Sequence, residues 1–243
     1  MERRTWRWYS PALNREMDLA CWGHYGKPVL LFPTAGGDFL ECERFLMVRA
    51  LTPLIEAGRI KVYASASISG EGWLNSDAHP AHKSWLQACY DRYLERELLP
   101  FIREDCNRTD QKLIVTGASI GAYNAVNALA KHPDYVDTAI AMSGTYFFDR
   151  WMNGHWDENY YFNMPVQYLP RMSEGPQLDA LRDSFFYLAT GSGRWEAPHE
   201  SWQLGQLLGA KGIPNHVDIW GGDADHDWPT WRTMLPMFLD RLV

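Results

Sequence analysis

Residues 112–131 read KLIVTGASIGAYNAVNALAK. The apolar, β-branched run over 112–116 predicts a buried strand, and the residues over 122–131 are helix-like. Between them lies a GxSxG motif, which at a strand-to-helix junction predicts a nucleophile elbow with Ser119 at its tip. Glycines suit such a turn because they carry no side chain that would collide in it. The alternative is a glycine-rich turn with an idle serine, and partners for Ser119 elsewhere in the chain would favour the elbow.

Segments on both sides of this stretch alternate between strand-like and helix-like. This order predicts an α/β protein with a mostly parallel central sheet and helices on both faces. The predicted strands are 5–10, 16–22, 28–32, 60–65, 112–116, 137–142, 185–189 and 217–220, of which the first two form an antiparallel pair. The predicted helices are 39–57, 81–103, 122–131 and 200–210.

No linker divides the chain, so we expect a single domain over residues 1–243. Residues 144–183 are rich in aromatic residues, Asn and Pro, and they show no regular period. We interpret this segment as an irregular, cap-like insertion after the sixth strand.

Composition narrows the class of protein and its partners. The net charge of −7 and the absence of a basic run argue against nucleic acid as a partner. No stretch is long and apolar enough to span a membrane, and the N-terminus lacks the apolar core of a secretory signal, so we expect a cytoplasmic protein. The four cysteines are widely spaced without a CxxC motif, which predicts reduced thiols and no metal site.

A serine hydroxyl is a weak nucleophile near neutral pH, so Ser119 needs a histidine to take its proton and an acid to orient that histidine. Of the eight histidines, His226 alone follows the last predicted strand directly, in the loop GGDADHDW. Glycines give this loop the freedom to bring a side chain over the edge of the sheet. We predict His226 as the base; the alternative is a surface histidine in an acidic turn.

The acid has several candidates near in sequence, namely Glu196, Asp223, Asp225 and Asp227. The order serine, acid, histidine of this architecture puts the acid in the loop after the penultimate strand, which here reads GSGRWE. We therefore predict Glu196, with Asp223 beside the histidine as the alternative. A glutamate can serve because the acid only holds the imidazole and compensates its charge.

Acyl transfer also needs donors aimed at the oxygen that becomes negative in the tetrahedral intermediate. The elbow supplies one donor, the backbone amide of Ile120. The second is expected from the loop PTAGGD after strand 28–32, where we predict Ala35 or Gly36. The alternative is that these glycines only make a tight turn.

Together these segments resemble the α/β-hydrolase superfamily, and more narrowly the bacterial putative-esterase group with esterase D and the mycolyltransferase-like esterases. The similar landmarks span nearly the whole chain: VLLFPTAGG at 29–37, TGASIGAY at 116–123, AIAMSG at 139–144 and GDADHDWPTW at 222–231. The resemblance implies an α/β-hydrolase fold and a serine hydrolase that cleaves carboxylic esters through an acyl-enzyme, without metal or cofactor. The chain differs from the group in having Pro33-Thr34 where His-Gly is frequent, and Trp195-Glu196 where many members have an aspartate.

Tryptophans are unusually frequent, and five of them suggest an aromatic-walled cleft: Trp73, Trp151, Trp156, Trp195 and Trp228. Each follows a strand or lies in the insertion, although tryptophans also pack loops onto helices. We predict substrate contact for Trp195 and Trp228, since each is within two residues of a predicted site residue. An apolar acyl or aryl group would suit such walls.

The leading hypothesis is a serine carboxylesterase with Ser119, His226 and Glu196 as its triad and a small-molecule ester as its substrate. The alternatives are an acyltransferase with the same triad, and a non-catalytic binding protein on a hydrolase scaffold. The presence of all three residue types in the required order favours an enzyme. The chain could also form a homo-oligomer, which these patterns do not decide.

Overall fold

The computed structural model describes residues 2–107 and 110–243, and in that part of the chain eight strands form one sheet. They are β1 (Arg3–Ser10), β2 (Arg15–Trp22), β3 (Lys27–Phe32), β4 (Ile60–Ser65), β5 (Leu113–Ala118), β6 (Val136–Met142), β7 (Phe185–Thr190) and β8 (Asn215–Ile219). Their order across the sheet is β1-β2-β4-β3-β5-β6-β7-β8. The pairs β1–β2 and β2–β4 are antiparallel and all others are parallel, so the predicted α/β class with a mostly parallel sheet is confirmed.

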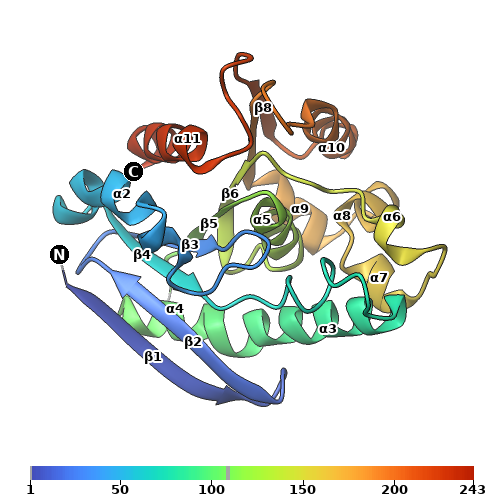
Figure 1. The fold of residues 1–243 in the computed structure, drawn as a ribbon, viewed down its shortest axis with the longest axis horizontal. Helices are drawn as coiled ribbons and strands as arrows, with labels where there is room; N and C mark the ends of the chain where they lie inside the picture. Colours follow the sequence, from blue (N-terminus) through green and yellow to red (C-terminus); the bar gives the residue numbers. More distant parts are fainter. Residues whose placement is uncertain (1, 108–109) are drawn as a thin grey trace.

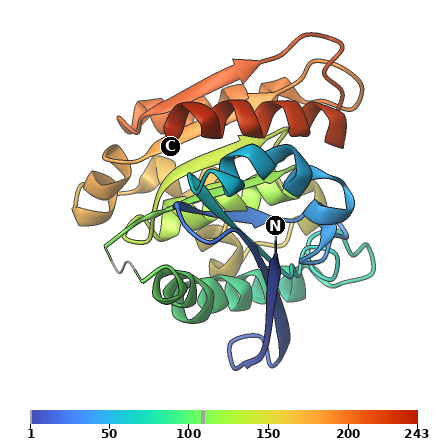
Figure 2. The same ribbon diagram turned by 90° about the vertical axis from the view of Figure 1, so that its left-hand side faces the viewer.

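Helices cover both faces of this sheet (Figures 1 and 2). The longer ones are α2 (Met47–Glu56), α3 (Pro80–Tyr93), α4 (Leu99–Asp105), α5 (Ile120–Lys131), α10 (Pro198–Ala210) and α11 (Trp228–Leu242). α2 and α11 pack together over one face, and α3, α4 and α5 lie over the other. α10 packs against β7 and β8.

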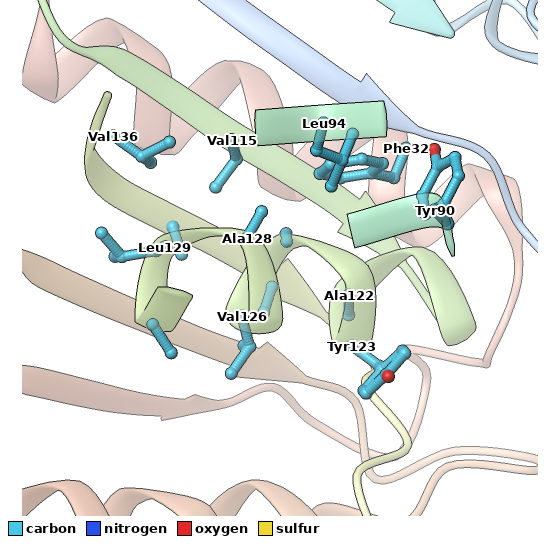
Figure 3. Packing of buried hydrophobic residues seen from close by; sticks show 14 of the residues in the cluster. Phe32, Tyr90, Leu94, Val115, Ala122, Tyr123, Val126, Ala128, Leu129 and Val136 are labelled. Atoms are coloured by element: carbon cyan, nitrogen blue, oxygen red, sulfur yellow. The ribbon is translucent and has the colours of Figure 1, made fainter. Parts of the chain in front are cut away.

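The two faces are filled by two apolar clusters, because successive side chains of a strand point to opposite sides of the sheet. In β3, Leu30 and Phe32 belong to the cluster under α5, whereas Val29 and Leu31 belong to the cluster under α2 and α11. Figure 3 shows the α5 side, where the helix lies against the side chains of β5 and β6. Residues 120–130 of α5 are all buried. The elbow helix is therefore held from every side, which fixes the position of Ser119 at its start.

Two predicted helices are interrupted. The stretch 39–57 forms α1 (Glu41–Arg44) and α2, which are separated at Leu46 by a left-handed backbone with φ 64°. The stretch 81–103 forms α3 and α4, joined by a π-helical turn over Leu94–Leu98. Pro100 lies in the first turn of α4 and has no N–H to donate to the preceding turn, which accounts for the change in hydrogen-bonding register.

The sequence pattern predicted an irregular segment over 144–183, and this prediction is wrong. It forms four short helices, α6 (Asp149–Met152), α7 (Glu158–Phe162), α8 (Pro165–Tyr168) and α9 (Pro176–Arg182), with a 3₁₀ turn at Leu169–Arg171. They contact α3 and α5 through buried aromatic side chains such as Phe148 and Tyr160. Helices of four to seven residues are too short to show a helical period, so tertiary packing and not local pattern stabilises them.

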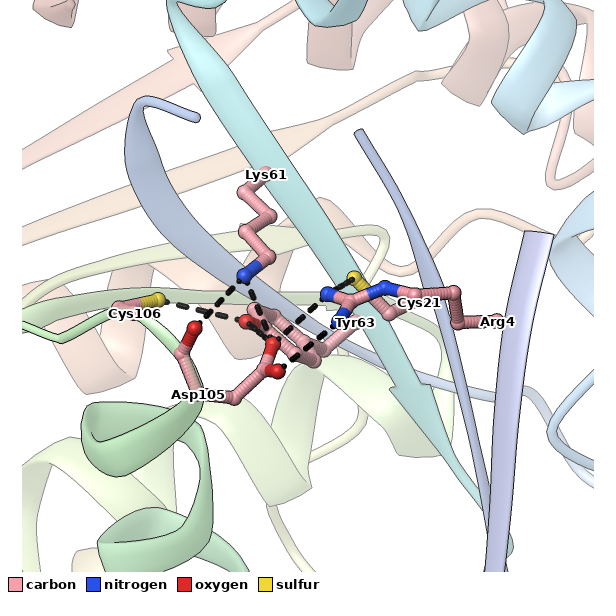
Figure 4. A network of polar contacts seen from close by, with 6 residues as sticks. All are labelled: Arg4, Cys21, Lys61, Tyr63, Asp105 and Cys106. Atoms are coloured by element: carbon pink, nitrogen blue, oxygen red, sulfur yellow. Dashed lines mark hydrogen bonds and ion pairs between the residues drawn. The ribbon is translucent and has the colours of Figure 1, made fainter. Parts of the chain in front are cut away.

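A polar network joins β1, β4 and the end of α4 at the amino ends of the parallel strands (Figure 4). Asp105 Oδ2 lies 2.7 Å from Lys61 Nζ and accepts hydrogen bonds from Tyr63 Oη at 2.6 Å and Arg4 Nη2 at 2.9 Å. Burial alone would raise the pKa of Asp105, but these donors outweigh burial and hold it below its ordinary value. The network thus ties the N-terminal hairpin to the sheet at the end remote from Ser119.

Candidate active site

Ser119 stands at the junction of β5 and α5 in a strained backbone conformation. Its φ of 56° and ψ of −122° lie outside the regions that non-glycine residues favour, at a cost of about 1–3 kcal/mol. The Ser119 N–H donates to the carbonyl of Met142 at 3.0 Å, and its own carbonyl accepts from Ala122 N–H at 3.1 Å. Strain of this kind persists only where the surroundings impose it, and it commonly marks a functional residue.

The glycines of the motif are required by close approach of the backbone. A Cβ on Gly117 would lie 2.5 Å from the carbonyl carbon of Gly121. A Cβ on Gly121 would lie 2.7 Å from the carbonyl oxygens of both Phe32 and Pro33. Both distances are far below van der Waals contact, so the elbow can form only with glycine at these two positions.

Ser119 opens onto a cavity of about 280 Å³ at the carboxyl ends of the parallel strands. The lining residues come from the elbow, from the loops that follow β3, β6, β7 and β8, and from the segments nearby. They are Ala35, Leu74, Ser119, Ile120, Ser143, Gly144, Thr145, Arg150, Trp151, Trp195, Ala197, Glu200 and His226. This is the edge at which open parallel sheets bind their ligands.

His226 and Glu196 meet behind this cavity. The Nδ1 of His226 lies 3.6 Å from Glu196 Oε2, and the glutamate side chain is only 1% exposed. Glu196 also accepts hydrogen bonds from Ser143 Oγ at 2.6 Å and from Thr190 Oγ1 at 3.0 Å. Burial alone would raise the pKa of Glu196, but the imidazole and the two hydroxyls outweigh burial and hold it below its usual range. Glu196 is therefore an anion facing the imidazole.

The loops that carry these two residues are bridged directly. Arg194 donates two hydrogen bonds to Asp225 Oδ2, at 2.9 and 2.7 Å, and the N–H of His226 donates to the carbonyl of Arg194 at 3.0 Å. Asp225 is thus engaged by Arg194. The alternative acid Asp223 is exposed. Of the carboxylates weighed from the sequence, the structure brings Glu196 to the imidazole.

Two further residues that the sequence analysis did not select hold this pair in place. Trp231 of α11 donates its Nε1–H to Ser143 Oγ at 2.9 Å, and Ser143 in turn donates to Glu196. The Trp231 ring also packs edge-on against His226, with centroids 5.2 Å apart. Ser143 has a left-handed backbone, with φ 47°. A polar residue at the end of the strand next to the elbow strand is the one local signal that could have indicated Ser143.

Two predicted oxyanion donors line the cavity. Ile120 begins α5, and the first N–H groups of a helix have no partner within it. Ala35 lies in an exposed turn that is closed by a hydrogen bond from Gly37 N–H to the carbonyl of Thr34 at 3.2 Å. That bond leaves the amides of Ala35 and Gly36 outside the turn, but Gly36 is not among the residues that line the cavity.

The turn with Ala35 is held by Glu41, another residue that sequence reasoning missed. Glu41 is 5% exposed, and its carboxylate accepts from Thr34 N–H at 2.7 Å and from Thr34 Oγ1 at 2.6 Å. A Cβ on Gly37 would lie 2.3 Å from this carboxylate, so the second glycine of the loop is needed to admit it. Glu41 thereby fixes the loop that presents Ala35.

The predicted tryptophans occupy different environments. Trp195 lines the cavity, is 83% exposed and has a left-handed backbone with φ 62°. Trp151 also lines the cavity. Trp228, predicted to contact substrate, is 8% exposed and stacks on Phe45 with centroids 5.0 Å apart, so its ring belongs to the core beneath α11. Trp73 is likewise a core residue, whereas Trp156 is exposed.

Comparison with known proteins shows the family to which this chain belongs. The family model described as "Putative esterase" matches residues 69–242. The chain belongs to the putative esterase family. This membership makes the protein a hydrolase that acts on small-molecule esters. No curated protein matches the sequence.

Solved structures of similar fold match nearly the whole length of the esterase. A ferulic acid esterase is 17% identical with a TM-score of 0.75, and the match covers 99% of this chain and 98% of that chain. MPT51 (FbpC1) of Mycobacterium tuberculosis is 16% identical with a TM-score of 0.75, covering 100% and 98%. An S-formylglutathione hydrolase from Agrobacterium tumefaciens is 14% identical with a TM-score of 0.72, covering 98% and 93%. At these identities the shared property is the α/β-hydrolase fold, which confirms the predicted fold class.

Neither a membrane-spanning helix nor a metal-binding cluster is present among the described residues. Within the described residues of the esterase, every helix is too short or too polar to pass through a bilayer. The same residues bring together no group of three or more His, Cys, Asp or Glu side chains that could hold a metal ion.

Proposed function

We propose that this esterase is a serine carboxylesterase that hydrolyses small carboxylic esters through an acyl-enzyme. Ser119 is the nucleophile, His226 the general base and Glu196 the acid that orients the imidazole. The observation that carries this proposal is the buried carboxylate 3.6 Å from an imidazole that shares a cavity with a strained serine. A merely structural serine would not need the strained backbone that this turn imposes.

In the first half-reaction, Ser119 Oγ attacks the ester carbonyl carbon while His226 Nε2 takes the hydroxyl proton. The carbonyl π electrons move to the oxygen, which accepts hydrogen bonds from the amides of Ile120 and Ala35. Collapse of this intermediate breaks the bond to the leaving alcohol, which receives the proton from His226. The product is the acyl group esterified to Ser119.

In the second half-reaction, water takes the place of the serine hydroxyl. His226 removes its proton as the water oxygen attacks the acyl carbon, and the same two amides stabilise the oxyanion. Ser119 Oγ then leaves and recovers the proton from His226, which releases the carboxylic acid and restores the enzyme. Throughout both halves Glu196 stays ionised and compensates the charge of the imidazolium.

The lowered pKa of Glu196 supports this assignment of roles. A group that must face a transient imidazolium has to be an anion at the working pH, and the donors Ser143 and Thr190 favour that form. Catalytic hydrogen bonds are often longer in the free enzyme than in the reacting complex, so 3.6 Å from His226 is compatible with this role.

The cavity favours a small substrate. Its volume of about 280 Å³ is at the lower limit of ligand pockets, about 300 Å³. Trp151 and Trp195 offer it flat apolar surfaces that suit a short acyl chain or a planar aryl group. One structural neighbour carries the name ferulic acid esterase, and the esters of that aromatic acid are of the class that such walls would admit.

Hydrolysis of 4-nitrophenyl acetate, butyrate and octanoate tests the proposal. The acetate and butyrate should react faster than the octanoate, and Ser119→Ala should lower kcat by about 10³-fold or more without changing the circular dichroism spectrum. Ser173→Ala, at an exposed serine of the segment 144–183, is the matched control and should be fully active. A fluorophosphonate should label Ser119, and a label on another residue or an active Ser119→Ala enzyme would contradict the proposal.

A further inference from the structure

The cavity next to Ser119 contains one arginine, Arg150 of α6, whose side chain is 57% exposed. Its guanidinium carbon lies 4.8 Å from the centroid of the Trp151 ring, an arrangement in which the indole holds the cation by its face. The Nη2 atom donates to Thr145 Oγ1 at 3.0 Å. These two contacts hold the guanidinium against Trp151 and Thr145, which also line the cavity.

Most of the hydrogen-bonding capacity of this guanidinium is unused within the protein. A guanidinium has five N–H donors, and among the described residues the bond to Thr145 is the one hydrogen bond that Arg150 makes. Its other polar neighbour is Glu200, with Oε1 3.9 Å from Nη1. That separation is too long for a hydrogen bond.

The carboxylate of Glu200 accepts hydrogen bonds from groups other than Arg150. Its side chain is 7% exposed, and Oε2 accepts from the N–H of Tyr146 at 2.5 Å while Oε1 lies 3.5 Å from Thr145 Oγ1. At 3.9 Å the charges of Arg150 and Glu200 still attract each other, but no hydrogen bond joins the two side chains. Arg150 thus presents free donors to the cavity, beside a carboxylate that has found other partners.

We propose that Arg150 binds a carboxylate of the substrate, an inference that rests on the proposed esterase function. The preferred substrates are then small esters with a free carboxylate. The planar guanidinium fork matches a carboxylate in two parallel hydrogen bonds. Trp151 behind the guanidinium and Trp195 on the same cavity give the apolar body of such an ester a surface to pack on. Because the chain carries a net charge of −7, an anionic substrate needs a local cation of this kind.

The test compares kcat/KM for matched charged and neutral esters. One pair carries the charge on the acyl side, mono-4-nitrophenyl adipate against 4-nitrophenyl hexanoate. The other carries it on the alcohol side, the butyryl ester of 3-hydroxybenzoate against that of methyl 3-hydroxybenzoate. For at least one pair, the ratio of charged to neutral should fall about 10- to 100-fold in Arg150→Gln, mainly through KM.

Two further variants make the result specific. Arg150→Lys keeps the charge but not the fork, so it should recover only part of the ratio. Arg96→Gln removes the same charge from a side chain that is 71% exposed and lies outside the cavity, and it should leave the ratio unchanged. An equal fall in Arg96→Gln would mean that overall charge and not Arg150 recognises the carboxylate, which overturns the proposal.

The possible failures are distinguishable. If the wild type hydrolyses the neutral esters and its ratios do not change in Arg150→Gln, the inference about Arg150 is wrong and the esterase proposal stands. If Ser119 proves not to be the nucleophile, calorimetric titration with 3-hydroxybenzoate and with adipate still tests the site. At least one of these anions should bind the wild type at least tenfold more tightly than Arg150→Gln, and equal binding of both would overturn the inference.

Discussion

Replacing Glu196 by glutamine tests whether the buried carboxylate serves the imidazole. The change keeps the shape of the side chain and removes its charge. Each carboxylate oxygen accepts from a hydroxyl, Oε1 from Ser143 and Oε2 from Thr190, so the new NH₂ group meets a donor on either side. If it takes the place of Oε2, it also donates to His226 Nδ1 and moves the imidazole proton to Nε2, the nitrogen that must accept a proton from Ser119.

The size of the effect follows from the geometry. Two unit charges at the observed 3.6 Å attract by about 5 kcal/mol at an effective dielectric constant of about 20. The amide keeps part of this as a neutral hydrogen bond, and 1.4 kcal/mol corresponds to about a tenfold change in rate. We therefore expect kcat of Glu196→Gln to fall about 10²- to 10³-fold. KM should change little, because a side chain that is 1% exposed cannot touch the substrate.

The assay is steady-state hydrolysis of 4-nitrophenyl butyrate at pH 8, with kcat and KM reported separately and folding checked by thermal unfolding. Asp223→Asn is the matched control, since it removes one negative charge from an exposed residue of the same pair of loops and should leave kcat unchanged. A kcat for Glu196→Gln within fivefold of wild type would refute the reasoning. A large loss in Asp223→Asn with an active Glu196→Gln would transfer the role of acid to Asp223.

Two further predictions concern stability. Ser143→Ala leaves the Trp231 N–H and one oxygen of Glu196 buried without partners, and each such group costs about 1–3 kcal/mol, so urea unfolding should show a loss of about 2–6 kcal/mol. Adding Trp231→Phe removes one of these orphaned groups, so the double variant should lose less than the sum of the single ones, and additive losses would rule out the coupling. Asp105→Asn should destabilise the protein at pH 7, because the pKa of Asp105 in the folded state is lowered, largely by Lys61. Stability that comes from a lowered carboxyl pKa is present above the pKa of the unfolded state, about 3.9, and is lost as the pH falls through the pKa of the folded state. The difference in unfolding free energy between Asp105→Asn and wild type should therefore shrink below about pH 4. A difference that does not change with pH would contradict an ionic role for Asp105.

The strands were predictable because their signals are local. A buried parallel strand is a short apolar run bounded by turn residues, and every predicted strand lies within two residues of its observed ends. The helices were less predictable from the sequence. The break at Leu46 and the π-helical turn before Pro100 come from packing and register, which a hydrophobic period does not report. The short helices of 144–183 and the final helix α11 were missed, the former because packing and not pattern makes them.

The candidate site divides in the same way. The GxSxG motif at a strand-to-helix junction indicates the turn from the sequence alone, and the contact that requires Gly117 lies within the motif. The contact that requires Gly121 comes from the end of β3 and is seen only in the structure. The supporting contacts of Glu41, Ser143 and Trp231 could not be predicted, because each joins residues that meet only after the sheet has formed. The environment of a single tryptophan was equally hidden, as Trp228 in the core illustrates.

What the sequence by itself determined is the alternation of strand and helix, the mostly parallel sheet and the sharp turn that exposes Ser119. These depend on backbone sterics and on side-chain periodicity over a few residues, and both can be inferred from residues that are close in sequence. Only the tertiary structure decided which carboxylate faces His226 and which tryptophans face the cavity. Those contacts depend on the pairing of β7 with β8 and on the bridge from Arg194 to Asp225, which join loops separated by some thirty residues.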